Sequence, residues 1–151
     1  MLRDQLRESL KQAMKAKDQR AVSTLRLILA ALKDRDIAAR GRGVTDGIGE
    51  PEIIEMMQKM VRQRHESIEL YERGGRPELA KQEAEEIAII EGYLPRQLDE
   101  AEASQAVDAV VAELGATTLK DMGRVMAALK ERFGGRMDFA KAGARVKQKL
   151  G

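Results

Sequence analysis

Apolar residues recur every three or four positions along most of this chain, and that spacing limits its fold more than any other feature. The run Leu119, Met122, Val125, Met126 and Leu129 shows the pattern most clearly. Such spacing places apolar side chains on one face of an α-helix. Strong helix formers dominate, and the chain has two Tyr, two Phe and no Trp, so little in it favours β-strands. We therefore predict an all-α fold.

Glycines and prolines divide this pattern into seven predicted helices. The helices span residues 2–14, 19–40, 51–73, 77–94, 100–114, from Thr117 or Thr118 to 133, and 139–150, with Asp18, Asp99 and Asp138 as N-caps. Pro95 ends the fourth helix because proline cannot continue it. We expect two helical subdomains: a four-helix, bundle-like N-terminal part of residues 1–95 and a three-helix C-terminal part of residues 96–151.

The pattern also predicts local detail. Met14 continues the apolar stripe of the first helix, and Ile37 belongs to the broad apolar face of the second, so both should be buried. The segment 41–49 holds four of the 13 glycines and breaks every periodicity. We expect it to be a mobile loop that acts as a hinge or tether.

The net charge of +2 hides a strong segregation of charge along the chain. Residues 1–42 hold 11 Lys and Arg against 5 Asp and Glu, and residues 114–151 hold 9 against 3. Residues 77–113 are the reverse, with 2 bases and 10 acids. A polyanion responds to the local field of a basic face rather than to the total charge. The basic C-terminal segment is therefore the strongest candidate for binding phosphate groups.

The candidate RNA-binding residues lie in that segment, on its two helices and the turn between them. They are Lys120, Gly123, Arg124, Lys130, Arg136, Lys141, Arg145 and Lys147. The scarcity of aromatic residues argues against single-strand binding, which uses exposed rings for stacking, but recognition of folded RNA needs mainly Arg, Lys and close backbone approach. The alternative is that these bases are solvated helix faces, partly matched by the acidic segment 77–113.

Gly123 has two explanations of equal weight. Glycine inside a helix costs about 1 kcal/mol relative to alanine, so its position between Lys120 and Arg124 needs a reason. A phosphate backbone could approach closely there, or a second helix could pack against the missing Cβ.

No catalytic set or cofactor site emerges from the sequence. The chain has no Cys, which excludes thiolate nucleophiles and thiolate metal sites. His65 is the single histidine, and neither a metal-ligand pattern nor a nucleophile elbow surrounds it. Glu83, Glu85, Glu86 and Glu91 are interpreted as exposed, solubilising acids on one helix. We expect no metal, no cofactor and no intrinsic catalysis. With no apolar run that could span a membrane and no signal pattern, we also expect a cytoplasmic protein without membrane contact.

Three stretches resemble a known family across nearly the whole chain. They are residues 23–41, residues 58–100, which contain the motif Tyr93-Leu94-Pro95-x-Gln97-Leu98, and residues 120–150, which contain Met122-Gly123-x-Val125-Met126. Together they resemble the GatB/YqeY family. The resemblance implies an all-α protein related to the C-terminal tail of the B subunit of glutamine-dependent aminoacyl-tRNA amidotransferase, a carbon-nitrogen ligase. That tail contacts the tRNA and is not catalytic, and its best match here begins at Gly123.

Two classes of function follow from these observations. The first is a non-catalytic module that binds tRNA or another structured RNA through the basic C-terminal segment, with a possible amidotransferase or other protein partner. The alternative is a protein-interaction or adaptor module without RNA binding. Amidation by the isolated chain is not expected, because the chain lacks the domain that binds ATP and the acylated tRNA end in the amidotransferase.

Overall fold

A computed structural model describes residues 1–151 and is all-helical, as predicted. The elements are α1 (Leu2–Ala16), α2 (Gln19–Arg40), α3 (Glu50–Arg73), α4 (Pro77–Glu91), α5 (Glu100–Leu114), the short 3-10 helix η1 (Leu119–Asp121), α6 (Met122–Phe133) and α7 (Phe139–Leu150). The chain divides into two compact units, unit 1 (Met1–Leu94) and unit 2 (Pro95–Gly151).

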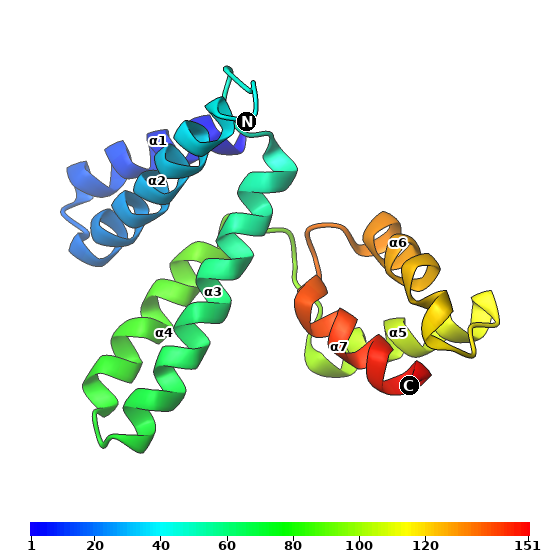
Figure 1. The fold of residues 1–151 in the computed structure, drawn as a ribbon. Helices are drawn as coiled ribbons and strands as arrows, with labels where there is room; N and C mark the ends of the chain where they lie inside the picture. Colours follow the sequence, from blue (N-terminus) through cyan, green and yellow to red (C-terminus); the bar gives the residue numbers. More distant parts are fainter. The chain divides into compact units, whose positions relative to one another are not determined.

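Unit 1 consists of two helical hairpins, α1–α2 and α3–α4 (Figure 1). Its core is built from aliphatic side chains and methionines rather than from rings. Leu6, Leu25, Ile28, Met57 and Ile90 are the largest side chains that are almost completely buried in it. Both α2 and α3 contact each of the other three helices, so these two helices hold the unit together.

Unit 2 has a separate core that α5, α6 and α7 enclose. Val110, Val125, Leu129 and Val146 are its most buried members. The helices α6 and α7 follow one another through the turn at residues 134–138 and pack side by side (Figure 1). The short helix η1 contacts both of them.

The helix boundaries follow the predicted capping residues. The carboxylates of Asp18, Asp99 and Asp138 each accept a hydrogen bond from a backbone N–H in the first turn of α2, α5 and α7 respectively. Gly115 ends α5 in the left-handed conformation, with φ 62°, which suits a residue without Cβ. The predictions of Asp18, Asp99 and Asp138 as helix N-caps are therefore confirmed.

Two of the predicted buried residues are exposed instead. Met14 keeps 48% of its surface accessible, and Ile37 keeps 51%. Met14 lies eight residues after Leu6, and each step of four residues drifts about 40° around the axis, so it leaves the buried stripe. Ile37 lies nine residues, or two and a half turns, after Ile28, which puts it on the opposite face of α2.

The loop at 41–49 has fixed contacts at its C-terminal end. The Asp36 carboxylate pairs with the Arg3 guanidinium and accepts the backbone N–H of Ile48 at 2.9 Å, while Arg3 Nη2 donates to the Ile48 carbonyl at 3.0 Å. Gly47 has φ +90°, and a Cβ there would lie 2.7 Å from the Arg3 guanidinium. Part of the predicted hinge is thus anchored to α1 and α2.

This anchor makes a stability prediction. Replacing Asp36 by alanine leaves the Ile48 N–H without its acceptor and Arg3 without its carboxylate, so we expect the free energy of unfolding of unit 1 to fall by about 1–3 kcal/mol. Both tyrosines, Tyr71 and Tyr93, lie in unit 1, so tyrosine fluorescence during urea unfolding measures the change.

The matched control is Asp34→Ala, which removes an exposed carboxylate two residues earlier on the same helix. We expect it to change stability by less than about 0.5 kcal/mol. Equal losses from the two substitutions would contradict a specific role for Asp36.

Candidate functional site

Several basic residues of unit 2 form ion pairs with acids of the same unit. Arg132 forms a two-pronged pair with Glu113 of α5, at 2.6 and 2.8 Å, and lowers the pKa of that carboxyl. Lys149 Nζ lies 2.6 Å from the Asp108 carboxylate, also on α5. Both acids belong to the acidic segment 77–113, so the alternative interpretation of this charge, as matching within the chain, accounts for these two bases.

Three of the eight candidate residues also have partners within unit 2. Arg124 Nη2 lies 2.9 Å from the Asp121 carboxylate, whose pKa is lowered first by the Thr117 backbone N–H and then by Arg124. Arg136 Nε donates to the Arg96 carbonyl at 3.1 Å, and Arg145 Nη1 donates to the Glu100 carbonyl at 3.1 Å. These two arginines tie the α6–α7 turn and α7 to the start of the unit.

The other four basic candidates are exposed lysines that form no ion pair or side-chain hydrogen bond within the chain. They are Lys120 on η1, Lys130 on α6, and Lys141 and Lys147 on α7. An exposed ammonium without a carboxylate neighbour is available to a phosphate group, whereas a paired one must first break its pair. These four lysines are therefore the strongest cationic contacts that unit 2 offers.

The packing of α6 on α7 places four of the candidates along one seam. Gly143 of α7 lies against the methyl ends of Met122 and Met126 of α6, at the distance a Cβ would have in ordinary contact. Lys130 follows Met126 by one turn, and Lys147 follows Gly143 by one turn, so each lies on the flank of its helix that borders the seam. We call Lys120, Gly123, Lys130 and Lys147 the seam surface, since η1 packs on both helices at the N-terminal end of α6.

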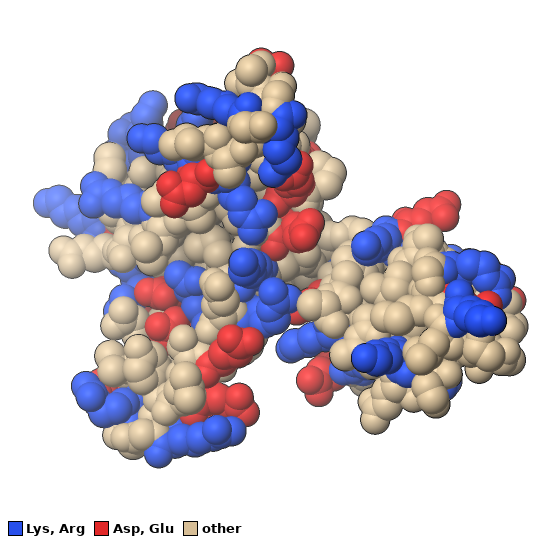
Figure 2. Space-filling view, in the orientation of Figure 1, with Lys and Arg blue, Asp and Glu red and all other residues tan.

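Lys141 lies outside the seam surface. It precedes Arg145 by one turn, on the other flank of α7, where Arg145 contacts α5. Figure 2 agrees with a dispersed arrangement: on the face of α5–α7 that it shows, basic side chains are separated by broad uncharged areas. The structure thus assembles part of the predicted set and separates the rest.

Gly123 is exposed in the first turn of α6, and a Cβ built on it would meet nothing within 4 Å. Close packing of a second helix within unit 2 therefore does not explain this glycine. Of the two explanations, close approach by a bound molecule is the one that the geometry leaves open.

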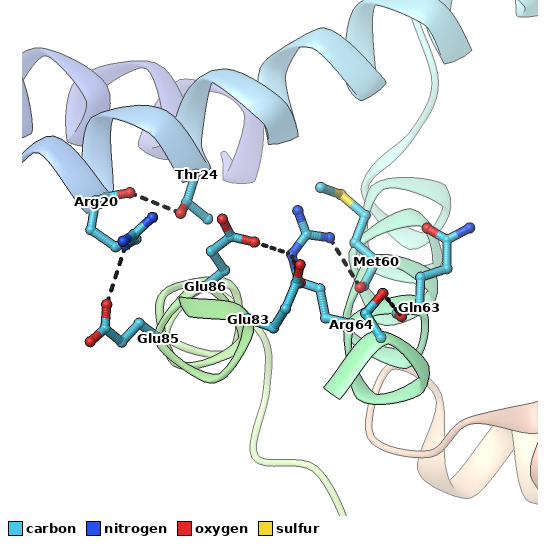
Figure 3. A network of polar contacts seen from close by, with 9 residues as sticks. Arg20, Thr24, Met60, Gln63, Arg64, Glu83, Glu85 and Glu86 are labelled. Atoms are coloured by element: carbon cyan, nitrogen blue, oxygen red, sulfur yellow. Dashed lines mark hydrogen bonds and ion pairs between the residues drawn. The ribbon is translucent and has the colours of Figure 1, made fainter. Parts of the chain in front are cut away.

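The acids of α4 are arranged differently from the prediction. Glu83, Glu85 and Glu86 were expected to be exposed, but Glu86 is only 6% accessible. Its carboxylate accepts from Arg64 Nε of α3 at 3.0 Å, and Glu83 lies at 4.0 Å from the same nitrogen (Figure 3). Glu86 precedes the buried Ile90 by one turn, and that spacing was the signal in the sequence for its burial.

This cluster ties the helices of unit 1 together. Arg64 also donates to the Met60 carbonyl at 3.1 Å, and Arg20 of α2 pairs with Glu85 at 3.2 Å (Figure 3). Burial raises the pKa of the Glu83 carboxyl, repulsion from Glu86 adds to the rise, and Arg64 opposes it. One guanidinium facing two carboxylates connects α3 to α4, and the Arg20 pair connects α2 to α4.

Two further features bear on the function. His65 is exposed on α3, and no group of three or more His, Cys, Asp or Glu side chains is placed to hold a metal ion. Every helix of the structure is too short or too polar to cross a membrane.

Comparison with known proteins identifies relatives of the chain. The family model described as Yqey-like protein matches residues 3–150. A curated relative named "Altered inheritance of mitochondria protein 41, mitochondrial" from Lachancea thermotolerans is 34% identical over 72% of this chain and 55% of its own length. Proteins of the same name from Eremothecium gossypii and Kluyveromyces lactis are 34% and 31% identical, over 59% and 58% of this chain and 46% and 45% of their own lengths. The chain spans about half the length of these curated relatives.

The names of these relatives correct one prediction. The sequence indicated a cytoplasmic protein, whereas each of these relatives is named as mitochondrial. The expected cytoplasmic localisation is therefore wrong.

In the cluster of Arg64, Glu83 and Glu86, the two isosteric substitutions Glu86→Gln and Glu83→Gln should have different effects on stability. Glu86→Gln weakens a buried charged pair, so we expect unit 1 to lose about 1–3 kcal/mol of stability at pH 7. Glu83→Gln removes the carboxylate with the raised pKa and its repulsion of Glu86, so stability should change by less than about 0.5 kcal/mol or increase.

The pH dependence gives an independent check of the same cluster. Because folded Glu83 keeps its proton to a higher pH than in the unfolded chain, its contribution to stability falls as pH rises above its ordinary pKa. In the Glu83→Gln variant, the free energy of unfolding measured from urea curves should therefore fall less steeply as pH rises. Equal losses from both substitutions, or an unchanged pH profile in Glu83→Gln, would contradict this assignment.

Proposed function

Because the chain belongs to the YqeY-like protein family, we propose that it is a non-catalytic helical module that binds tRNA or another folded RNA through unit 2. The observation that carries the proposal is the seam surface, where three unpaired lysines lie on η1, α6 and α7 and where a Cβ at the exposed Gly123 would meet nothing within 4 Å. Lys141, on the neighbouring flank of α7, supplies a further cation.

The chemistry of the seam surface suits a phosphate backbone. Lysine ammonium groups bind phosphates as point charges, and Gly123 allows a chain to approach the helix without meeting a Cβ. Gly123 also lies in the first turn of α6, where the helix dipole adds partial positive charge. Recognition of this kind reads the shape of folded RNA and needs no aromatic platform.

The internal pairs set the expected strength of binding. Residues 114–151 hold nine bases, but Arg124, Arg132 and Lys149 are paired with carboxylates, and Arg136 and Arg145 donate to backbone carbonyls, which leaves four lysines. Four lysines would neutralise about four phosphates, which corresponds to a slope of log affinity against log salt of about −3 to −4. This is moderate, salt-sensitive binding rather than a dense electrostatic patch.

The family resemblance makes tRNA the first RNA to test. The related amidotransferase tail contacts tRNA without catalysing amide formation, so we propose that this chain also binds tRNA without catalysis. Any part in amidation would then be to hold tRNA for another protein. The chain itself would need no cofactor for this role.

The adaptor alternative has less support than the RNA proposal. It relies on the acidic segment 77–113 docking onto a partner, but Glu86, Asp108 and Glu113 of that segment are engaged by bases of this chain. Retention of a partner after RNase treatment of a pull-down would favour the adaptor, and loss of the partner would favour RNA.

Reversal of the four unpaired lysines tests the proposal directly. We expect Lys120→Glu, Lys130→Glu, Lys141→Glu and Lys147→Glu together to lower affinity for tRNA by more than about tenfold and to reduce the salt slope by about one for each phosphate that is no longer neutralised. Fluorescence anisotropy with labelled tRNA at several salt concentrations measures both quantities.

The control reverses four exposed lysines of unit 1, namely Lys11, Lys15, Lys59 and Lys81, which gives the same change in net charge. It should retain most of the affinity. No tRNA binding by the native chain at low salt, or equal losses in the two variants, would refute the proposed site.

Gly123→Ala separates binding from stability. Alanine is the better helix former and its Cβ meets no neighbour, so unit 2 should gain about 0.5–1 kcal/mol, while the added methyl group should weaken tRNA binding. Gly143→Ala is the control, because its Cβ would face Met122 and Met126 inside the seam. It should be tolerated without loss of affinity. A Gly123→Ala variant that binds tRNA as well as the native chain would contradict close approach at this position.

A further inference from the structure

The outer face of α2, in unit 1, exposes apolar side chains that the core does not use. Leu27 keeps 46% of its surface accessible, and Ile37, ten residues later, lies on the same outward half of the helix. Met14 of α1 is exposed beside this face and accepts a hydrogen bond from Arg26 Nη2 at 3.7 Å through its sulfur. These residues leave apolar surface exposed on this side of unit 1, with the exposed Asp34 between Leu27 and Ile37.

The surface around Met14 and Leu27 forms a hollow. An open hollow of about 730 Å³ lies where α1 turns into α2. Met14, Val22 and Leu27 supply its apolar lining, and Lys17 and Arg26 supply its positive charge. A hollow with this lining can accept an apolar side chain whose neighbours are negatively charged.

A row of bases continues from the hollow along α2. Arg26, Lys33 and Arg40 follow one another at seven-residue intervals, so they share one face of the helix and are spaced about 10 Å apart. No carboxylate of the chain pairs with them, whereas Arg20 and Arg42 at either end of the helix pair with Glu85 and Glu52. In Figure 2, basic side chains outnumber acidic ones on the α1–α2 part of the visible face.

We infer that this α2 face, defined by the hollow and by Lys33, Ile37 and Arg40, binds an acidic amphipathic helix of a partner protein. Such a helix would place an apolar side chain in the hollow and acids about every seven residues against Arg26, Lys33 and Arg40. This interaction is independent of RNA binding by unit 2.

Charge and shape favour this occupant over three others. A phosphate backbone would match the row of bases but leave the apolar lining unused. A flat lipid surface would not fill a hollow. No helix of this chain carries three acids at seven-residue intervals, so a second copy does not offer a row that matches Arg26, Lys33 and Arg40.

Site-specific photocrosslinking in living cells tests the inference with the full chain. A benzoylphenylalanine replaces Leu27 in one variant, and in the matched variant it replaces Leu70, an exposed leucine of α3 that is distant in sequence. Mass spectrometry then identifies the crosslinked segment. We expect position 27, and not position 70, to crosslink to a protein segment with apolar residues at helical spacing and flanking acids.

A charge reversal supplies the second measurement. Lys17→Glu with Arg26→Glu should lower the yield of that crosslink by about tenfold, while Lys59→Glu with Lys81→Glu, also exposed bases of unit 1, should leave it unchanged. A crosslink to RNA, to lipid or to another copy of the chain would overturn the inference, and so would equal or absent crosslinking at both positions.

Discussion

The burial of aliphatic and methionine side chains in two separate cores is the constraint on which the rest of the structure depends. Leu94 packs on the first core and Leu98 on the second, so the chain passes from one to the other within four residues, across Pro95. Each fully buried Leu, Ile, Met or Val contributes about 1.5–3 kcal/mol. With so few rings, both cores depend on many such residues at helical spacing. That requirement fixes which face of every helix turns inward and therefore which charges remain outside.

The charges that remain outside have two roles. Some bases serve the fold: Arg64 joins α3 to α4, Arg3 anchors the loop before α3, and Arg132 and Lys149 pair with α5. Other unpaired bases are scattered over the surface, but those of the seam surface in unit 2 and of the α2 face in unit 1 form the two candidate binding surfaces. An exposed ion pair contributes little to stability, but it reduces the charge available to a ligand. The distinction between paired and unpaired bases therefore identifies which parts of a basic segment can bind a ligand.

The sequence predicted the helices well because capping residues and apolar spacing are local signals. Asp18, Asp99, Asp138 and Pro51 each stand where a helix begins. Burial of particular side chains was harder to predict: Ile37 is apolar yet exposed, and Glu86 is charged yet buried, because both depend on which neighbouring helix packs where. The same holds for the site. The basic segment was visible in the sequence, and so was the local spacing of the Arg124–Asp121 pair, but Arg136 and Arg145 find partners through tertiary packing that periodicity does not reveal.

A titration of the ¹⁵N-labelled chain with tRNA, followed by amide NMR, tests the central claim most directly. If unit 2 binds RNA through the seam surface, the amides of residues 120–124, 130 and 143–147 should shift or broaden first, and added salt should reverse the change. The amide signals of α3 and α4 should keep their chemical shifts and line widths. Changes confined to unit 1, or spread evenly over both units, would contradict the account.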